Sequence, residues 1–195
     1  MREKRNAVIE TKHLYCSHLS DADVNEIKSF SVVNKEGIGV EKFIRFNSYI
    51  HEDTNLDRSY LVRVKATDEL VAYFSLRAGF VALDNMSENE DSFDSIPGVE
   101  ISNFAINKHY RQKHPKTKGI GKVIFENIIK AIIEETAKLI GVRIVYIFAL
   151  PKDKLLSYYQ GAFDFSRLSE EQENKMHNRI RPAYDKDCIF MYQRI

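Results

Sequence analysis

The stretch that decides the fold runs from residue 99 to residue 140 and reads VEISNFAINKHYRQKHPKTKGIGKVIFENIIKAIIEETAKLI. Residues 99–106 are rich in strand-forming side chains. The last part carries isoleucines at positions 120, 124, 128 and 132, the spacing of one helix face. Between them lies a basic segment that ends at Gly119 and Gly121. The stretch therefore predicts a strand, a basic loop and a long helix that opens at a Gly-Ile-Gly sequence.

The beginning of that helix has the features of a phosphate-binding site. Backbone N–H groups in a first helical turn lack partners inside the helix and lie at the positive end of its dipole. Glycines there let a phosphate approach closely, and no acidic residue interrupts segment 108–122. We therefore predict a pyrophosphate site, with a solvated basic loop as the plain alternative, although P-loop and GxGxxG patterns are absent. The basic residues of the segment are Lys108, Arg111, Lys113, Lys116, Lys118 and Lys122.

Helix and strand patterns alternate on both sides of this stretch. Upstream segments show helical spacing and then strand alternation, and a nearly continuous apolar strand follows at 142–150. Interleaved helices and strands predict an α/β or α+β fold, organised as one domain over residues 1–195. The expected strands are 13–18, 60–66, 70–83, 99–106, 142–150, 163–168 and 188–193, and the expected helices are 21–30, 40–50, 119–140, 152–159 and 169–181.

The composition indicates a globular protein without a dominant charge. Hydrophobic residues make up 44% of the chain, enough for a core, and 29 basic against 28 acidic residues leave a net charge of +1. This balance excludes nucleic-acid or membrane binding by bulk charge. Cys16 and Cys188 are too few for a disulfide framework, so we expect buried thiols in a reducing cytoplasm. No run approaches the roughly 20 apolar residues of a membrane span, and no histidine or cysteine cluster implies a metal.

A second charged segment is acidic. Residues 83–100 contain six acidic residues and no Lys or Arg, and we expect them to form a loop between two strands. Such a loop would suit a cationic substrate. Glu100, at its end, lies four residues before Phe104. Because alternate residues share a strand face, these two side chains should point to the same side, about 13 Å apart.

The basic segment and the strand before it resemble motif A of the GNAT superfamily of N-acetyltransferases, usually written Q/R-x-x-G-x-G/A. The matching residues are Lys116-Thr117-Lys118-Gly119-Ile120-Gly121, and Asn103-Phe104-Ala105-Ile106 is similar to the hydrophobic-Ala-hydrophobic end of the family's preceding strand. The order of elements from about residue 10 to 195 also matches. The resemblance implies a GNAT-like mixed, mostly antiparallel central sheet flanked by helices, with splayed fourth and fifth strands.

The same resemblance implies acetyl-CoA as cosubstrate. The pantetheine arm would bind the backbone of Phe104, Ala105 and Ile106, and the pyrophosphate would bind Gly119, Ile120, Gly121 and Lys122. The motif departs from the family in two ways: Lys116 stands at its first position, and Arg111 is separated from the glycines by about five extra residues that include Pro115. The cation for the pyrophosphate therefore stays open between Arg111, Lys116 and Lys118.

Two catalytic roles follow from the resemblance alone. In the family, a tyrosine in the helix after the fifth strand protonates the departing thiolate, and segment 155–165 (LLSYYQGAFDF) resembles that motif. Alignment on the apolar positions selects Tyr159, and alignment backward from Phe163 selects Tyr158; a core aromatic is the alternative for either. Glu100 is similar in position to the general base of the histone-acetyltransferase branch, or else it only ends the acidic segment in solvent.

The resemblance as a whole implies an acetyl-CoA-dependent N-acetyltransferase that moves the acetyl group to a primary amine by direct attack in a ternary complex. One alternative is a toxin-type acetyltransferase that acts on aminoacyl-tRNA. Another is a catalytically silent CoA-binding regulatory domain. The expected partners are acetyl-CoA and an amine acceptor, with no membrane, nucleic acid disfavoured by the net charge, and homodimer formation left open.

Overall fold

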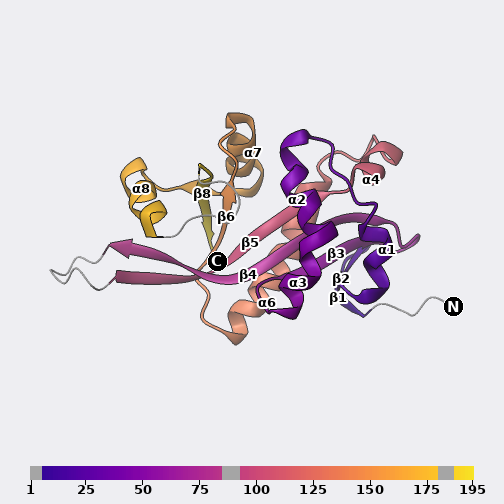
Figure 1. Cartoon of the computed structure of the whole chain (residues 1–195), viewed down its shortest axis with the longest axis horizontal. Helices are drawn as coiled ribbons and strands as arrows, with labels where there is room; N and C mark the ends of the chain where they lie inside the picture. Colours follow the sequence, from indigo (N-terminus) through magenta and orange to yellow (C-terminus); the bar gives the residue numbers. More distant parts are fainter. Residues whose placement is uncertain (1–5, 85–92, 180–186) are drawn as a thin grey trace. The chain divides into compact units, whose positions relative to one another are not determined.

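The computed structural model describes residues 6–84, 93–179 and 187–195. Its strands form a sheet in the order β1-β2-β3-β4-β5-β6-β8-β7 (Figure 1). The strands are β1 (Ala7–Glu10), β2 (Leu14–His18), β3 (Arg58–Val64), β4 (Leu70–Asp84), β5 (Phe93–Ile106), β6 (Ile144–Ala149), β7 (Ser166–Arg167) and β8 (Ile189–Arg194). The α-helices are α1 (Val24–Ile27), α2 (Ile38–Lys42), α3 (Ser48–Asp53), α4 (Lys108–Lys113), α5 (Ile120–Ile124), α6 (Lys130–Leu139), α7 (Asp153–Phe163) and α8 (Glu170–Arg179).

The chain divides into two compact units. The first holds residues 1–77 and 102–132, and the second holds residues 78–101 and 133–195. The long strands β4 and β5 contribute to both. Short 3₁₀ turns precede α1 and α2, whereas π-helical turns at Phe43–Asn47 and Phe125–Ile129 join α2 to α3 and α5 to α6. The sequence motifs for the cofactor therefore fall in the first unit and the tyrosine motif in the second.

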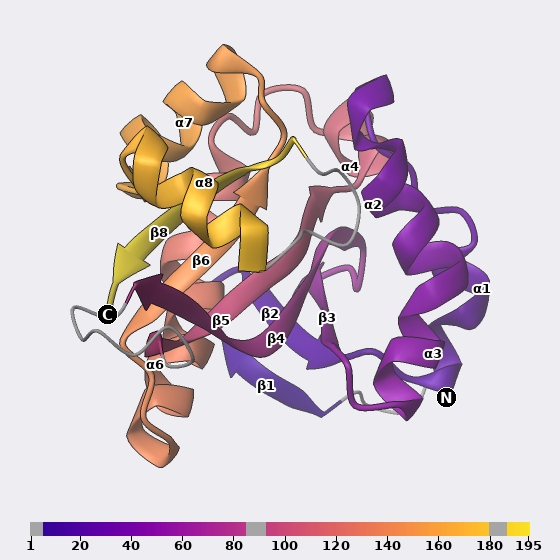
Figure 2. The same ribbon diagram turned by 60° about the vertical axis from the view of Figure 1, so that its left-hand side comes forward.

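The first unit is built on an antiparallel meander. Strand β2 pairs with β1 and β3, and β3 pairs with β4, for example at Leu61↔Tyr73. Helices α1, α2 and α3 lie together along these strands (Figure 2). Burying their apolar faces against the sheet is the main stabilising term, because about 25 cal/mol is gained per Å² of apolar surface removed from water. The core cluster comprises Ile27, Phe30, Phe43, Ile44, Leu61, Leu70, Tyr73 and Ala105.

The second unit surrounds β6, whose residues are almost all buried, as a strand covered on both faces should be. Strand β6 pairs antiparallel with β8, and it pairs parallel with β5 from Gly98↔Ile144 to Glu100↔Tyr146. A Cβ at Gly79 would come within 1.9 Å of the Tyr146 hydroxyl, so only glycine allows that ring to cross the strand. The core cluster comprises Val81, Ile144, Tyr146, Met176 and Phe190.

The structure confirms the mixed α/β class and corrects several boundaries. The expected acidic loop at 83–100 is wrong in extent, because β4 continues to Asp84 and β5 already begins at Phe93. Strand β5 lies beside β4 in the sheet, and this pairing outweighs the weak strand propensity of the acidic residues. Residues 85–92, with three of those acids, lie outside the described residues. The expected basic loop is also partly wrong, since residues 108–113 form α4, and the strand expected at 13–18 has a neighbour, β1, that the sequence analysis missed.

Two further expectations can be compared with the structure. Cys16 and Cys188 are both buried thiols, as predicted, and burial raises the pKa of the Cys16 thiol far above its ordinary value. Within the described residues, no helix has the length and apolar character needed to cross a membrane. The described residues also contain no group of three or more His, Cys, Asp or Glu placed to hold a metal ion.

Candidate cofactor and active site

Asn107 fixes the junction between β5 and the basic segment. Its backbone N–H donates to Val71 O at 2.8 Å, and its buried side-chain Nδ2 donates to Leu70 O at 3.2 Å. The side-chain Oδ1 accepts from the backbone N–H of His109 at 3.1 Å, which caps α4. An asparagine at the end of the strand therefore starts a helix where the sequence analysis expects a loop.

The turn at Gly119 is the part of the site that glycine makes possible. Gly119 has φ 72° and ψ 11°, in the left-handed region, and it caps the N-terminus of α5. The residue is exposed and an added Cβ would meet no atom within 4 Å, so backbone conformation rather than space selects glycine. Ile120 and Gly121 are buried in the first turn that follows. Helix α5 continues through the π-helical turn into α6, so its first N–H groups lie at the end of a helix that runs to Leu139.

The cations around this turn fall into two groups. Lys113 and His114 both contact Oε2 of Glu69, at 3.1 and 2.9 Å. Burial would raise the pKa of the Glu69 carboxyl, but hydrogen bonds from His114 and Lys113 outweigh it and leave that pKa below its ordinary value. By contrast, the second group forms no ion pair within the described part of the chain, and all its members are exposed. These residues are Arg111, Lys116, Lys118 and Lys122.

The backbone segment expected to bind the cofactor lies at the end of β5. Ser102 donates to Asp57, which follows α3, and Ala105 belongs to the core cluster that α1–α3 form with the sheet. Buried and half-buried side chains alternate along residues 99–105, and Glu100 and Phe104 are both half-buried. That these two side chains share one face of the strand stays a prediction.

Glu100 lies in the second unit at the last residue pair of the parallel register, opposite Tyr146. Its side chain is half-buried, whereas Val99 and Ile101 on either side are buried. The position is therefore in the strand rather than at the end of a solvated loop.

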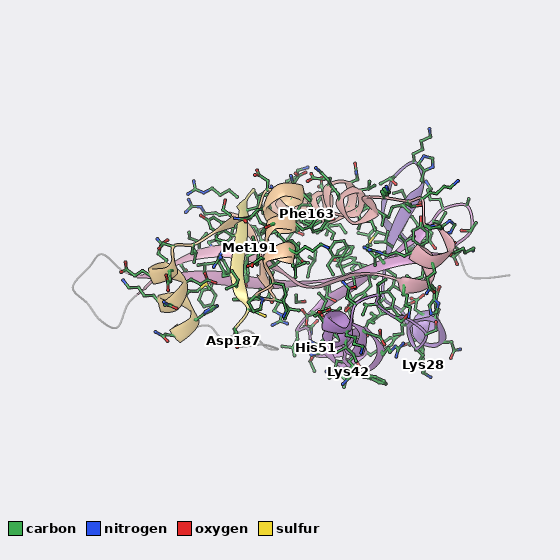
Figure 3. All side chains as sticks on the ribbon, turned by 90° about the horizontal axis from the view of Figure 1, so that it is seen from above. Lys28, Lys42, His51, Phe163, Asp187 and Met191 are labelled. Carbon is green, nitrogen blue, oxygen red and sulfur yellow. The ribbon has the colours of Figure 1, made fainter. Side chains whose placement is uncertain are left out.

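The two tyrosines of the second unit differ in environment. Tyr158 is 45% exposed, whereas Tyr159 is half-buried and packs against Phe163 and Phe165, with ring centroids 5.7 and 6.0 Å apart. Burial raises the pKa of Tyr159 to about 12, and the neighbouring Tyr158 adds to this shift. The Tyr159 phenol therefore stays protonated at neutral pH and can donate a proton or a hydrogen bond. Figure 3 labels Phe163, the aromatic residue of α7 that both tyrosine rings contact.

One cluster of functional groups has no signal in the local sequence. In the first unit the imidazole of His51, on α3, lies against the buried carboxylate of Asp57, which also binds Arg77 and Ser102. The histidine belongs to none of the metal or nucleophile patterns, and its partners come from three separate strands or loops. Only the fold brings them together.

Comparisons with known proteins identify the fold. A scan against profiles of protein families found no match, and neither did a search of curated proteins. Among solved structures, a tyrosine-to-phenylalanine mutant of the toxin AtaT is 13% identical, with 97% of this chain and 95% of that chain covered and a TM-score of 0.65. A tyrosine-to-phenylalanine mutant of KacT is 15% identical, with 94% and 95% covered and a TM-score of 0.63.

Two other matches carry ligands. AtaTR bound with acetyl-CoA is 16% identical, covers 94% of each chain and gives a TM-score of 0.62. AtaT complexed with acetyl-methionyl-tRNAfMet is 14% identical, covers 91% of this chain and 93% of that chain, and gives a TM-score of 0.61. At these identities the likeness is one of fold. The mixed, mostly antiparallel sheet flanked by helices matches the fold of these structures and agrees with the architecture that the sequence resemblance implies.

Proposed function

We propose that this chain is an acetyl-CoA-dependent N-acetyltransferase, organised as a single catalytic domain in the cytoplasm. The observation that carries the proposal is the left-handed Gly119 turn, which opens a long helix in the segment after β5 and α4. Four exposed cations of this segment form no ion pair in the described residues. This arrangement offers backbone N–H groups and positive charge to a pyrophosphate. A GNAT fold over nearly the whole chain supports the same cosubstrate, because a match of that fold, AtaTR, was solved with acetyl-CoA.

Each part of the cosubstrate has a proposed partner. The pyrophosphate binds the backbone of Gly119, Ile120 and Gly121, with Arg111, Lys116, Lys118 and Lys122 as the available cations. The pantetheine arm pairs with the backbone of Phe104, Ala105 and Ile106, as the family resemblance implies. Lysine serves as a point-charge partner for phosphate, although it lacks the planar fork of arginine.

The chemistry is direct attack of a neutral amine on the thioester carbonyl. The new C–N bond forms as the C–S bond breaks, and the departing CoA thiolate takes up a proton. We assign Tyr159 as the donor to the sulfur, with Tyr158 as the alternative, because the Tyr159 phenol remains protonated at every physiological pH. Glu100 is the residue that the family resemblance proposes as proton acceptor for the amine.

A second candidate function is acetylation of the amino group of aminoacyl-tRNA. The match to AtaT complexed with acetyl-methionyl-tRNAfMet favours it, and the exposed cations at 111–122 could contact phosphates of an RNA as well as those of CoA. Both candidates use the same bond-forming step and differ only in the acceptor.

The experiment that tests the proposal measures CoA release from acetyl-CoA with three sets of acceptors: small primary amines, peptides with a free N-terminus, and charged tRNAs. Release that depends on one of these sets supports acetyl transfer and identifies the acceptor class. Tight acetyl-CoA binding without release in any set would contradict the enzyme assignment and favour a regulatory CoA-binding domain. Absence of acetyl-CoA binding would contradict both.

A further inference from the structure

A buried carboxylate in the first unit holds a histidine whose side chain is partly exposed. The Asp57 side chain is fully buried, and its Oδ2 lies 2.5 Å from Nδ1 of His51, whose side chain is 24% exposed. Asp57 Oδ1 accepts from Ser102 Oγ at 2.6 Å, and the Arg77 guanidinium donates to both carboxylate oxygens at 3.1 and 3.3 Å. Figure 3 shows His51 on the same side of the sheet as Lys28 and Lys42, the side that α1–α3 cover.

The hydrogen bonds around Asp57 select the tautomer of the histidine. Burial acts to raise the pKa of the Asp57 carboxyl, but hydrogen bonds from Ser102, His51 and Arg77 outweigh it, and the pKa lies below its ordinary value. Asp57 is therefore ionised at neutral pH and can only accept hydrogen bonds. Nδ1 of His51 must then carry a proton to donate to Asp57, and in the neutral form of the imidazole Nε2 carries the lone pair.

The imidazole is also held in orientation. Phe43 packs against it edge to face, with ring centroids 4.9 Å apart and an interplanar angle of 84°. The backbone carbonyl of His51 accepts from the N–H groups of Leu56 and Asp57 at 2.9 and 3.4 Å, so the loop that carries the carboxylate is tied to the helix that carries the ring. Within the described residues, the ring makes no hydrogen bond other than that to Asp57.

The charged groups around His51 and Asp57 suit a histidine that acts as a base. Arg77 faces the carboxylate from β4, and on α3 itself the acidic residues Glu52 and Asp53 follow the histidine. Glu52 is already engaged by Arg58 at 3.0 Å. The ionised Asp57 directly stabilises the imidazolium that forms when Nε2 takes a proton, in the way that a buried aspartate supports a catalytic histidine.

Ser102 connects this pair to the cofactor strand. It lies two residues before Phe104 on β5, about 7 Å along a strand, and Phe104 begins the backbone segment proposed for the pantetheine arm. The carboxylate that orients His51 is thus bonded to the same strand as this segment.

We propose that His51 is the general base of the acetyl transfer, with Asp57 as its positioning residue; this inference rests on the proposed N-acetyltransferase function. As the acceptor nitrogen forms its bond to the thioester carbonyl, Nε2 of His51 takes the N–H proton and becomes imidazolium. The C–S bond breaks, and the thiolate is protonated from Tyr159 or from solvent. His51 then returns its proton to solvent, so protons and charge balance over the cycle.

The test compares the wild-type chain with His51→Gln, His51→Ala and the control His13→Gln, an exposed histidine in the turn before β2. The measured quantities are kcat/KM for CoA release, with an acceptor that the wild type uses, and the calorimetric Kd of acetyl-CoA. We expect His51→Gln to lower kcat/KM by about 100-fold near pH 7, the usual range for a general base, with acetyl-CoA affinity within about twofold of wild type. The deficit should shrink at high pH, where solvent deprotonates the amine. Added imidazole should restore part of the activity of His51→Ala.

Three outcomes would overturn the inference, and they have different meanings. Equal kcat/KM values in His51→Gln and His13→Gln would overturn the role of His51. CoA release by the wild type would still support the proposed acetyltransferase function. Loss of activity together with loss of acetyl-CoA binding, and with no effect of imidazole, would assign His51 a structural role only. Failure of the wild-type chain to release CoA with any acceptor would overturn the proposed function and this inference with it.

Discussion

The hydroxyl of Ser102 on β5 donates a 2.6 Å hydrogen bond to Oδ1 of Asp57, which lies 45 residues earlier in the chain. The carboxylate is fully buried, so this bond ties the cofactor strand to the loop between α3 and β3. A hydrogen bond to a charged, buried acceptor contributes more than one between neutral groups at the surface. The contact therefore bears on both the stability of the first unit and the geometry of the proposed base.

Ser102→Ala should lower the free energy of unfolding by about 1–3 kcal/mol, because Asp57 loses one of the donors that stabilise its charge. Urea unfolding measures the change. Ser29→Ala is the control, since the Ser29 hydroxyl makes an exposed hydrogen bond to Glu26 O and its loss should cost little. Equal midpoints for the two variants would show that the Ser102 hydroxyl adds nothing to the folded state.

The pKa of Asp57 predicts how stability depends on pH. Because this pKa is lower in the folded protein than in the unfolded chain, Asp57 stabilises the fold above its unfolded value of about 3.9, and the contribution is lost as pH falls through the folded value. Wild-type stability should therefore drop between about pH 5 and pH 2 more steeply than that of Asp57→Asn, which should be less stable at neutral pH. The measurement is the urea unfolding midpoint of each protein as a function of pH. Parallel pH profiles for the two proteins would contradict a lowered pKa of Asp57 in the folded protein.

Tyr159→Phe should lower kcat for CoA release about tenfold or more while leaving acetyl-CoA affinity nearly unchanged, because it removes a group that acts on the leaving thiolate. Tyr158→Phe is the matched comparison, since the two neighbours point about 100° apart on α7. Steady-state kinetics with calorimetric binding separates the two effects. A larger loss in Tyr158→Phe would move the assignment to the exposed tyrosine, and full activity in both would leave the thiolate without a protein acid.

Glu100→Gln tests the base that the family resemblance proposes. If Glu100 accepts the proton, the variant should lose most of its activity near neutral pH and recover part of it at high pH, with acetyl-CoA binding unaffected. The pH dependence of kcat/KM in this variant, measured beside that of His51→Gln, decides whether Glu100 or His51 accepts the proton. A wild-type profile in Glu100→Gln would leave His51 as the base supported by the structure.

The sequence predicts the elements whose signal is local. The isoleucines from 120 to 132 mark the helix, and the apolar run at 142–150 marks β6, because each burial pattern repeats within a few residues. Gly119 is similarly readable, since a glycine before a helix indicates an unusual backbone conformation. The fold class follows from the order of these elements.

What the sequence does not reveal depends on contacts between distant residues. The start of β5 at Phe93 cannot be predicted from the sequence, because acidic residues and Pro97 have weak strand propensity. Their strand conformation comes from the sheet rather than from propensity. Helix α4 is hidden in a run of cations, because its start depends on Asn107 being held by Leu70 and Val71 of β4. The His51–Asp57 pair is invisible for the same reason.

Calorimetric titration of acetyl-CoA into the wild type, Gly119→Asn and Gly119→Asp tests the central claim that the Gly119 turn binds the pyrophosphate. Asn and Asp both tolerate the left-handed conformation, and a Cβ at this position meets no atom within 4 Å, so the two variants differ chiefly in charge. Gly39→Asp, at an exposed glycine of the other Gly-Ile-Gly sequence that also has open space around it, is the control. We predict that the wild type binds acetyl-CoA, that Gly39→Asp keeps near wild-type affinity, and that Gly119→Asn loses affinity modestly. Gly119→Asp should bind at least about tenfold more weakly than Gly119→Asn. This factor is equivalent to about 1.4 kcal/mol of repulsion between its carboxylate and the pyrophosphate. Equal affinity in Gly119→Asp and the wild type, or no acetyl-CoA binding by the wild type, would contradict the claim.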